Sequence, residues 1–177
     1  MKNYLSVGLL LISFGAQSNQ LSGSVVRVLD GDTVDVLTNT LCEVQHYVPK
    51  GGSKCINNKE QIRVRFAFID APESKQPFGN KSKQFLANLV MNKVVSIKDA
   101  KRDVHGRVLG NVYVSNVWIN KEMVSNGMAW VYRQYAKNSP LIQIEEEASR
   151  NKFGLWALPK QERLEPWIWR KNAKSQN

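Results

Sequence analysis

Three acidic residues of the sequence have the types and spacing needed to hold a metal ion and activate water. Asp32 lies in the segment DGDT, and Asp70 and Glu73 lie in the segment DAPES. Paired carboxylates at neighbouring strand ends form a site of hard oxygen ligands, which suits Ca²⁺ or Mg²⁺. Ala71 could add its backbone carbonyl, because Pro72 restrains Ala71 to an extended conformation and fixes the direction of that group. We therefore predict a divalent-cation site formed by Asp32, Asp70 and the Ala71 carbonyl.

Glu73 and two arginines add the groups needed to break a phosphodiester bond. Glu73 follows Asp70 by three residues and could act as general base on a water held near the metal. Arg65, in RVRFAFID, and Arg107, in HGR, carry planar guanidinium groups that grip phosphate oxygens. These arginines should matter most as charge builds up on phosphorus in the transition state. A metal, a base and two arginines together predict phosphodiester hydrolysis.

Each of these segments also has an ordinary structural interpretation. DGDT is typical of a hairpin turn, DAPE of a loop opening and HGR of a surface turn, while Arg65 could simply pair with an acid. His105 is expected to lie in a turn or at the edge of the substrate rather than to act as a catalytic acid. The acidic run at 145–147 indicates a solvated helix face rather than a second metal site. The choice between a catalytic site and these structural interpretations depends on whether the surrounding helices and strands bring the segments together.

The N-terminal half of the chain is typical of β-structure. Residues 24–29 and 33–37 are β-branched runs joined by Asp-Gly, which predicts a hairpin. Asp30 is expected to form the turn, and Asp35 to point outward from its strand. The polar residues 38–60 predict a long loop. Residues 61–69 alternate between two faces and predict a strand that carries Arg65 and leads to Asp70.

The rest of the chain alternates between helical and extended patterns. Helices are predicted at 79–92, 119–127 and 139–156, strands at 93–100 and 108–114, and an extended segment at 129–135. Five strands with inserted helices indicate a small closed barrel in one domain, residues 22–160. A basic tail, residues 161–177, follows it, and its tryptophans are expected to fold back onto the body.

The first 18 residues predict a signal peptide. Lys2 is followed by a mostly apolar run at 4–15, and Ala16 and Ser18 are small residues spaced for cleavage. The run is too short for a comfortable transmembrane helix, although an uncleaved N-terminal anchor is the alternative. We expect a protein that is exported to the periplasm or secreted, with no stable membrane insertion after cleavage.

The two cysteines fit an exported protein. Cys42 and Cys55 lie 13 residues apart and are expected to form a disulfide; the alternative is a pair of free thiols in a cytosolic protein. No clustered histidines accompany them, so a zinc site is not predicted.

The charge balance favours a polyanionic partner. The chain has 25 Lys and Arg residues against 15 Asp and Glu, giving a formal net charge of +10. Such a charge suits nucleic acid or an anionic surface, although many basic proteins bind neither.

An ordered set of motifs resembles the staphylococcal nuclease family. The motifs are LDGDTV, RVRFAFIDAPES, DVHGRVLGNVYV, VSNGMAWVYRQY and FGLW, spread over about residues 24–157. The resemblance implies an α+β OB-fold, a five-stranded β-barrel with three α-helices. It also implies a nuclease that hydrolyses DNA and RNA with Ca²⁺ and leaves 3′-phosphate and 5′-hydroxyl ends, and we expect a monomer.

The resemblance assigns roles residue by residue. It implies calcium ligation by Asp32, Asp70 and the Ala71 backbone carbonyl, general-base catalysis by Glu73, and phosphate stabilisation by Arg65 and Arg107. Substrate binding is implied at Tyr135, which matches a nucleotide-stacking tyrosine, and at Arg133, which stands where a second tyrosine occurs in the best-known member. An arginine there can stack on a base or hold a phosphate.

The sequence departs from the best-known member at other positions as well. Ala71 stands where that member has Thr, the segment after DAPE is shorter and lacks paired lysines, and the 38–60 loop has no counterpart. Two alternatives remain: a non-catalytic nucleic-acid-binding OB-fold domain, and an exported structural protein. Neither needs Glu73 or paired carboxylates, so both leave this set of residues unexplained.

Overall fold

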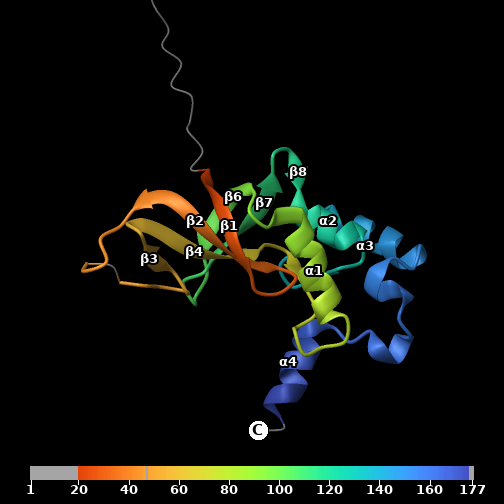
Figure 1. The fold of residues 1–177 in the computed structure, drawn as a ribbon. Coiled ribbons are helices and arrows are strands. Elements are labelled where there is room, and N and C mark those ends of the chain that lie inside the picture. The colour runs from red at the N-terminus through yellow and green to blue at the C-terminus, as the bar shows by residue number, and fades with distance from the viewer. Residues whose placement is uncertain (1–19, 47, 176–177) are drawn as a thin grey trace, which may run out of the picture.

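Five long strands close into a mixed β-barrel in the computed structural model, which describes residues 20–46 and 48–175 (Figure 1). The strands follow the order β4-β2-β1-β6-β7 with antiparallel neighbours, and a parallel pairing of β4 with β7 closes the barrel. This architecture confirms the predicted α+β fold with a five-stranded OB-like barrel. The barrel strands are β1 (Leu21–Val28), β2 (Thr33–Leu41), β4 (Lys59–Phe66), β6 (Val94–Arg102) and β7 (Val108–Val114).

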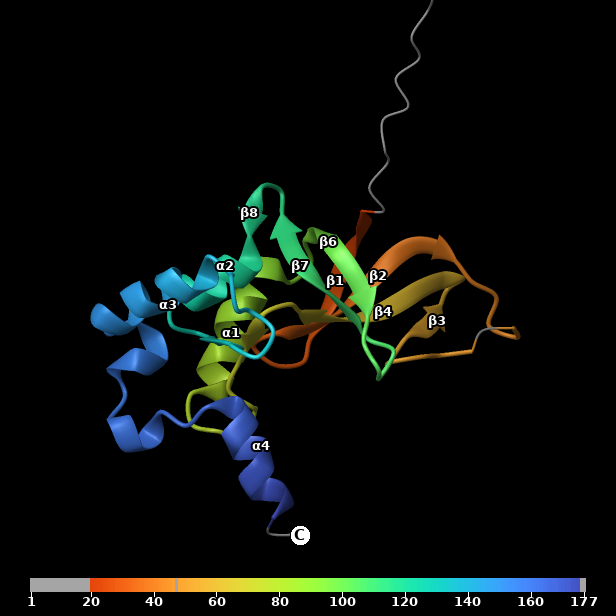
Figure 2. The same ribbon diagram turned by 180° about the vertical axis from the view of Figure 1, so that it is seen from behind.

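The helices gather at one end of the barrel in both views of the ribbon (Figures 1 and 2). The three predicted helices are present but shorter than expected, and a further helix, α4, lies in the segment predicted as a basic tail. The helices are α1 (Gly79–Val90), α2 (Ile119–Ser125), α3 (Leu141–Arg150) and α4 (Pro166–Lys174), with 3₁₀ turns η1 (Gly154–Ala157) and η2 (Lys160–Glu162). The short strands are β3 (Lys54–Ile56), β5 (Ile69–Asp70), β8 (Val117–Trp118) and β9 (Trp130–Val131).

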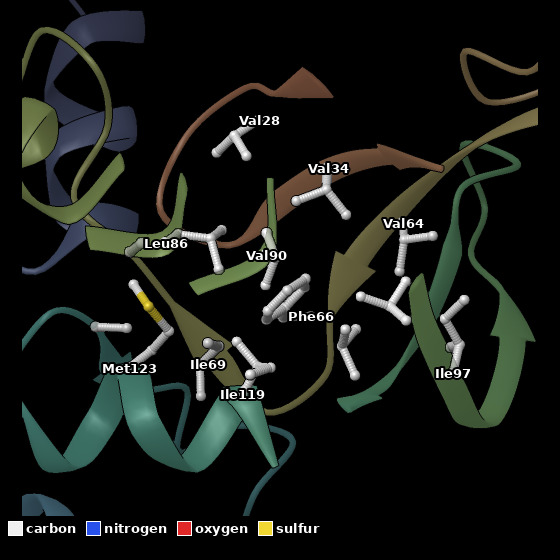
Figure 3. Packing of buried hydrophobic residues seen from close by; sticks show 14 of the residues in the cluster. Val28, Val34, Val64, Phe66, Ile69, Leu86, Val90, Ile97, Ile119 and Met123 are labelled. Carbon is white, nitrogen blue, oxygen red and sulfur yellow. The ribbon is translucent and has the colours of Figure 1, made fainter. Parts of the chain in front are cut away.

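One hydrophobic core joins the barrel to these helices. Inward-facing strand residues such as Val34 and Phe66 pack with Leu86 of α1 and with Ile119 and Met123 of α2 (Figure 3). All five side chains are almost completely buried, and burying an apolar side chain of this size contributes roughly 1.5–3 kcal/mol. The core therefore holds the helical end of the barrel rigid, and the chemistry-bearing residues lie beside it.

The strand predicted at 61–69 ends earlier than expected. β4 stops at Phe66, and Phe68 adopts a left-handed conformation with φ 67°, which is uncommon for a large side chain. The chain turns there, and Ile69 and Asp70 leave the barrel to pair with β9. Because of this turn, Asp70 does not continue β4. It lies at the end of the barrel where Asp32 and Arg65 also lie, here called the barrel mouth.

The segment predicted as a loop at 38–60 contains strand residues at both of its ends. β2 continues to Leu41, and β3 pairs with the start of β4 through a tight turn at Asn57 and Asn58, with φ values of 49° and 60°. Paired positive φ values are typical of hairpin turns that match strand twist. Cys42 and Cys55 are joined by a disulfide with a Cα–Cα distance of 5.9 Å.

Asp35 is buried, which overturns the prediction that it points to solvent. Its carboxylate accepts hydrogen bonds from Arg63 Nε at 2.9 Å and from Arg27 Nε at 2.8 Å. The physical reason is register, because Asp35 lies opposite Arg27 on β1 and opposite Arg63 on β4. Two cross-strand cations therefore compensate the buried charge.

The predicted signal peptide, residues 1–18, lies outside the described residues. Across residues 20–46 and 48–175, no helix has the length and apolar character required to cross a membrane.

Candidate active site

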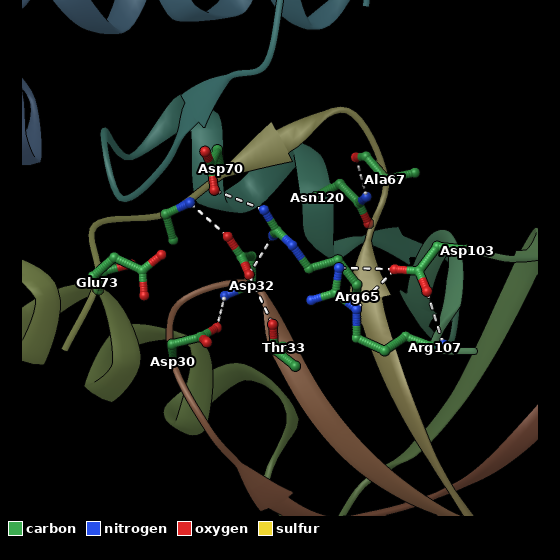
Figure 4. A network of polar contacts seen from close by, with 12 residues as sticks. Asp30, Asp32, Thr33, Arg65, Ala67, Asp70, Glu73, Asp103, Arg107 and Asn120 are labelled. Atoms are coloured by element: carbon green, nitrogen blue, oxygen red, sulfur yellow. Dashed lines mark hydrogen bonds and ion pairs between the residues drawn. The ribbon is translucent and has the colours of Figure 1, made fainter. Parts of the chain in front are cut away.

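The site forms where the β1–β2 turn, the end of β4 and β5 meet (Figure 4). Thr33 pairs with Arg65 across β2 and β4, and the Phe66 amide donates to the Asp32 carbonyl at 2.8 Å. These main-chain contacts set Asp32 beside Arg65. Asp70 follows four residues after Phe66, so three segments deliver their charged groups to one place.

A close approach to α1 fixes the turn that carries Asp32. A Cβ built on Gly31 would lie 1.9 Å from the Ser82 hydroxyl, so only glycine fits between the turn and the helix. Asp30 accepts a hydrogen bond from the Asp32 amide at 3.0 Å, which confirms that it forms the turn.

Asp32 is buried and almost fully hydrogen-bonded. Its Oδ1 accepts from the Thr33 hydroxyl at 2.9 Å, and its Oδ2 accepts from the Ala71 amide at 2.6 Å. The Ala71 amide thereby ties β5 to the β1–β2 turn. Asp32 and Ala71 are adjacent in space, although 39 residues separate them in the chain.

Arg65 bridges the two buried aspartates. One guanidinium nitrogen forms an ion pair with Asp32, and Nη2 donates to Asp70 Oδ1 at 2.7 Å. The side chain of Arg65 is only 13% exposed. Arg65 therefore pairs with acids, as its structural interpretation predicted, and the acids are those predicted to hold a metal.

For both aspartates, the effect of burial on the pKa outweighs the effect of the arginines that pair with them. Burial raises the pKa of Asp32 to about 6, against the opposing positive charge of Arg65. Burial also raises the pKa of Asp70, against a hydrogen bond from Arg170. Both shifts mean that the carboxylates are held in a low-dielectric environment where further positive charge stabilises their ionised forms.

The donor groups fit a hard divalent cation. Asp32 and Asp70 carry carboxylate oxygens, and Ala71, whose amide contacts Asp32, also carries a main-chain carbonyl; these are the types of oxygen ligand that Ca²⁺ accepts. Within the described part of the chain, no group of three or more His, Cys, Asp or Glu side chains could hold a metal.

Glu73 lies at the rim of the site, with its side chain 36% exposed. Its amide donates to Gln76 Oε1 at 3.1 Å, which holds the loop after β5 in a tight turn. A carboxylate at the rim can reach both solvent and a ligand at the aspartates.

Arg107 lies at the end of the turn that leads into β7, the strand that closes the barrel against β4. It immediately precedes β7, in which Leu109 pairs with Arg65, and Asp103 accepts from Arg107 Nε at 2.8 Å (Figure 4). Burial tends to raise the pKa of Asp103, but hydrogen bonds from Arg107 lower it below its ordinary value. The amide of His105 donates to Asp103 at 2.9 Å, so His105 belongs to the turn.

Of the two predicted substrate-binding side chains, one is exposed and the other is held in an ion pair. Tyr135 is 63% exposed and packs edge-to-face on Tyr132, whereas Arg133 is paired with Glu145 at 2.6 Å. Glu145 is buried, which overturns the prediction of a wholly solvated acidic run at 145–147. The reason is that Glu145 also accepts the Val131 amide of β9 at 2.6 Å.

Arg170 of α4 is a site residue that the sequence analysis missed. Its Nη2 donates to Asp70 Oδ2 at 2.6 Å, and its Nη1 donates to Asp70 Oδ1 at 3.1 Å and to Glu73 Oε1 at 2.7 Å. The hydrogen bonds that Arg170 donates to Asp70 raise the pKa of Arg170 above its ordinary value. In the sequence, only the basic character of the C-terminal tail indicated that one of its residues could contact the acids of the site.

Comparisons with known proteins match most of this chain to nucleases. The family model described as staphylococcal nuclease homologue matches residues 63–158. A micrococcal nuclease of Shigella flexneri is 38% identical over 94% of this chain and 89% of its own length. An uncharacterized endonuclease of Escherichia coli is 35% identical over 96% of this chain and 98% of its own length.

A more distant relative shares only part of its length with this protein. A staphylococcal-like nuclease of Arabidopsis thaliana is 35% identical over 67% of this chain and 36% of its own length. The Shigella flexneri and Escherichia coli relatives, which match most of the chain, are named as a nuclease and an endonuclease. The protein therefore belongs to the staphylococcal nuclease family, and it is a nuclease.

Proposed function

We propose that this nuclease hydrolyses DNA and RNA with Ca²⁺ as its cofactor and leaves 3′-phosphate and 5′-hydroxyl ends. The observation that carries the proposal is the bridge from Arg65 to two buried carboxylates, Asp32 and Asp70, with Glu73 at the rim. A non-catalytic binding domain would not need buried acids at a phosphate-binding surface, because carboxylates repel the phosphate backbone of a nucleic acid.

Asp32 and Asp70 would hold the cation with the Ala71 carbonyl. When bound, Ca²⁺ supplies positive charge against the scissile phosphate. Asp32 keeps its orientation through the Thr33 hydroxyl and the Ala71 amide. Such second contacts hold a ligand in place while a cation binds.

Glu73 would accept a proton from the attacking water. The water oxygen forms a bond to phosphorus, the bond from phosphorus to the 5′-oxygen breaks, and the leaving oxygen takes a proton from solvent. The partial exposure of Glu73 allows a solvent molecule to approach it. This direction of attack leaves the phosphate on the 3′-oxygen.

Arg65 and Arg107 would neutralise the charge on the five-coordinate phosphorus. Arg65 reaches the site from the end of β4, and Arg107 from the start of the paired strand β7. Their guanidinium groups are held by Asp70 and Asp103, so little reorganisation is needed when substrate arrives.

Substrate contacts beyond the phosphate would come from Tyr135 and Arg133. The exposed ring of Tyr135 offers a surface for base stacking, which is tolerant of sequence. Arg133 would contact the substrate with its guanidinium while Glu145 orients it. The net charge of +10 would add non-specific attraction to nucleic acid.

We also propose that the protein is an exported monomer. Residues 1–18 would be removed as a signal peptide, residues 22–160 would form the nuclease domain, and the product would be periplasmic or secreted. The disulfide between Cys42 and Cys55 supports this proposal, because disulfides persist in oxidising compartments.

Digestion assays test the chemistry. Plasmid DNA and an RNA transcript are incubated with wild type and Glu73→Gln, in millimolar Ca²⁺ and in a chelator. We expect wild type to cut both in Ca²⁺ only, the variant to lose about 100-fold or more in rate, and the product 5′ ends to accept labelled phosphate without phosphatase treatment. Cutting in the chelator would contradict the calcium assignment, and blocked 5′ ends would contradict the proposed products.

A further inference from the structure

The C-terminal helix α4 covers the proposed cation site with its own arginine. Arg170 donates hydrogen bonds to both carboxylate oxygens of Asp70, at 2.6 and 3.1 Å, and to one carboxylate oxygen of Glu73, at 2.7 Å. These residues lie about a hundred positions earlier in the chain, and the family model ends at residue 158. The contact therefore belongs to a part of this protein outside the matched nuclease region.

The contact is incompatible with the proposed roles of both acids. Asp70 Oδ1 also accepts from Arg65 Nη2 at 2.7 Å, so the two arginines occupy three of the roughly four lone-pair positions from which the Asp70 carboxylate could ligate a cation. Glu73 Oε1 accepts a hydrogen bond from Arg170 Nη1 at 2.7 Å, so this oxygen is occupied by a guanidinium and not by a water molecule.

The remaining attachment of α4 to the body is light. Pro166 is the only buried residue of the helix, and α4 projects away from the rest of the protein in both ribbon views (Figures 1 and 2). Trp167 stacks on Tyr132 with ring centres 5.2 Å apart, and Gln76 donates to the Leu164 carbonyl. Elements with few buried contacts open at low free-energy cost.

The stacking contact also places α4 beside the proposed substrate surface. Tyr132 packs edge-to-face on Tyr135 with ring centres 5.1 Å apart, so Trp167 and the proposed stacking residue Tyr135 both pack against the Tyr132 ring. The helix thus touches the proposed ligand, the proposed base and the aromatic cluster at once.

We propose that α4 is a self-inhibitory segment that competes with the cation for Asp70 through Arg170. This inference rests on the proposed calcium site. Docking of Arg170 and binding of Ca²⁺ exclude one another, so each weakens the other by the same factor. Release of α4 uncovers Asp70 and Glu73 together, which couples loading of the cation to exposure of the base.

Direct binding measurements on the full-length protein test the competition without relying on activity. Ca²⁺ affinity is measured by calorimetry for wild type, Arg170→Gln and Lys171→Gln. The control removes the same charge from the next position, which is exposed. We expect Arg170→Gln to bind Ca²⁺ about 5-fold or more tightly than wild type, the lower end of typical coupling between sites, and the control to remain within about 2-fold because surface charges act weakly.

Hydrogen exchange of the amides in α4 provides the second readout. Addition of Ca²⁺ to wild type should speed exchange in α4, and Arg170→Gln should show fast exchange already without Ca²⁺. Equal affinities of wild type and Arg170→Gln, or an α4 that stays protected when Ca²⁺ is bound, would overturn the inference and leave the proposed nuclease chemistry intact. Failure of all three proteins to bind Ca²⁺ would instead contradict the proposed calcium site, and the inference that rests on it.

Discussion

The backbone of Gly51 lies directly against the backbone of Gly106. A Cβ built on Gly51 would lie 2.1 Å from the Gly106 carbonyl carbon and 2.3 Å from the Arg107 nitrogen. Gly51 belongs to the loop closed by the Cys42–Cys55 disulfide, and Gly106 precedes the proposed catalytic Arg107. The disulfide loop therefore supports the turn that positions this arginine.

Gly51→Ala should misplace the Arg107 turn. The added methyl group cannot fit, and the φ of +59° at Gly51 adds strain for any other residue; a left-handed position of this kind costs about 1–3 kcal/mol. We expect a lower melting temperature and a fall in kcat of about 10-fold or more, since a small displacement of a catalytic group costs that much. Thermal melts and digestion rates measure both effects.

A matched control separates the turn from the loop itself. Val48→Ala changes an exposed residue of the same loop, and should leave kcat and the melting temperature unchanged. An unchanged kcat in Gly51→Ala would contradict the support of Arg107 by the disulfide loop.

Arg65→Lys should lose most of the activity although the charge is kept. Arg65 bonds Asp32 and Asp70 with two separate nitrogens, and a lysine ammonium is a single point charge that cannot reproduce the planar fork. We expect kcat to fall about 100-fold, as for removal of one well-placed donor to a developing charge. Single-turnover digestion at saturating Ca²⁺ measures the chemical step; a lysine variant that cuts at the wild-type rate would remove Arg65 from the proposed mechanism.

Asp35→Asn should destabilise the barrel without affecting metal binding. The buried carboxylate is bonded to Arg63 and Arg27, whose side chains are 24% and 54% exposed. Because both arginines retain access to water, we expect a loss of about 1–3 kcal/mol in the free energy of unfolding, less than for a fully buried pair. Urea unfolding and Ca²⁺ calorimetry measure the two quantities.

Arg27→Gln is the control for this pair. It removes the more exposed partner and leaves Arg63 in place, so its effect should stay below about 1 kcal/mol. A larger loss in the control than in Asp35→Asn would show that Asp35 is not the centre of the cluster.

The stability of the protein should depend on pH through Glu145. Burial raises the pKa of Glu145 above its ordinary value, against the Val131 amide and Arg133. The folded state therefore binds a proton more tightly than the unfolded state. As the pH rises from the ordinary pKa of a glutamate through this raised value, ionisation is penalised only in the folded protein, and stability is lost.

Unfolding of wild type and Glu145→Gln across this pH range checks the sign. The stability of wild type relative to Glu145→Gln should be greatest below the ordinary pKa and decline as the pH rises. Glu146→Gln changes an exposed neighbour and should show no such trend. A wild type that gains stability relative to Glu145→Gln with rising pH would contradict the raised pKa.

Local patterns were sufficient to predict the main features of the fold and most of the candidate site. Alternation identified the strand carrying Arg65, the Asp-Gly pair identified the β1–β2 turn, and helical spacing identified three helices. Asp32 and Asp70 could be grouped because each stands at a predicted strand boundary, and the structure places both in contact with Arg65.

Other features depend on partners that are distant in the sequence. Asp35 alternates like a surface residue, and only the opposite arginines of β1 and β4 make its burial possible. Glu145 looks like its neighbours until β9 supplies an amide to it. Arg170 meets Asp70 across a separation of 100 residues, and no local pattern encodes such a contact.

Arg65 and Arg170 place two guanidinium groups against the acids at the barrel mouth. The chain thus provides from its own side chains part of the countercharge of those acids. With the proposed calcium site, folding would not depend on the ion for this countercharge, so that folding and metal loading would be separate events. The supply of ions would then decide where the protein begins to cut.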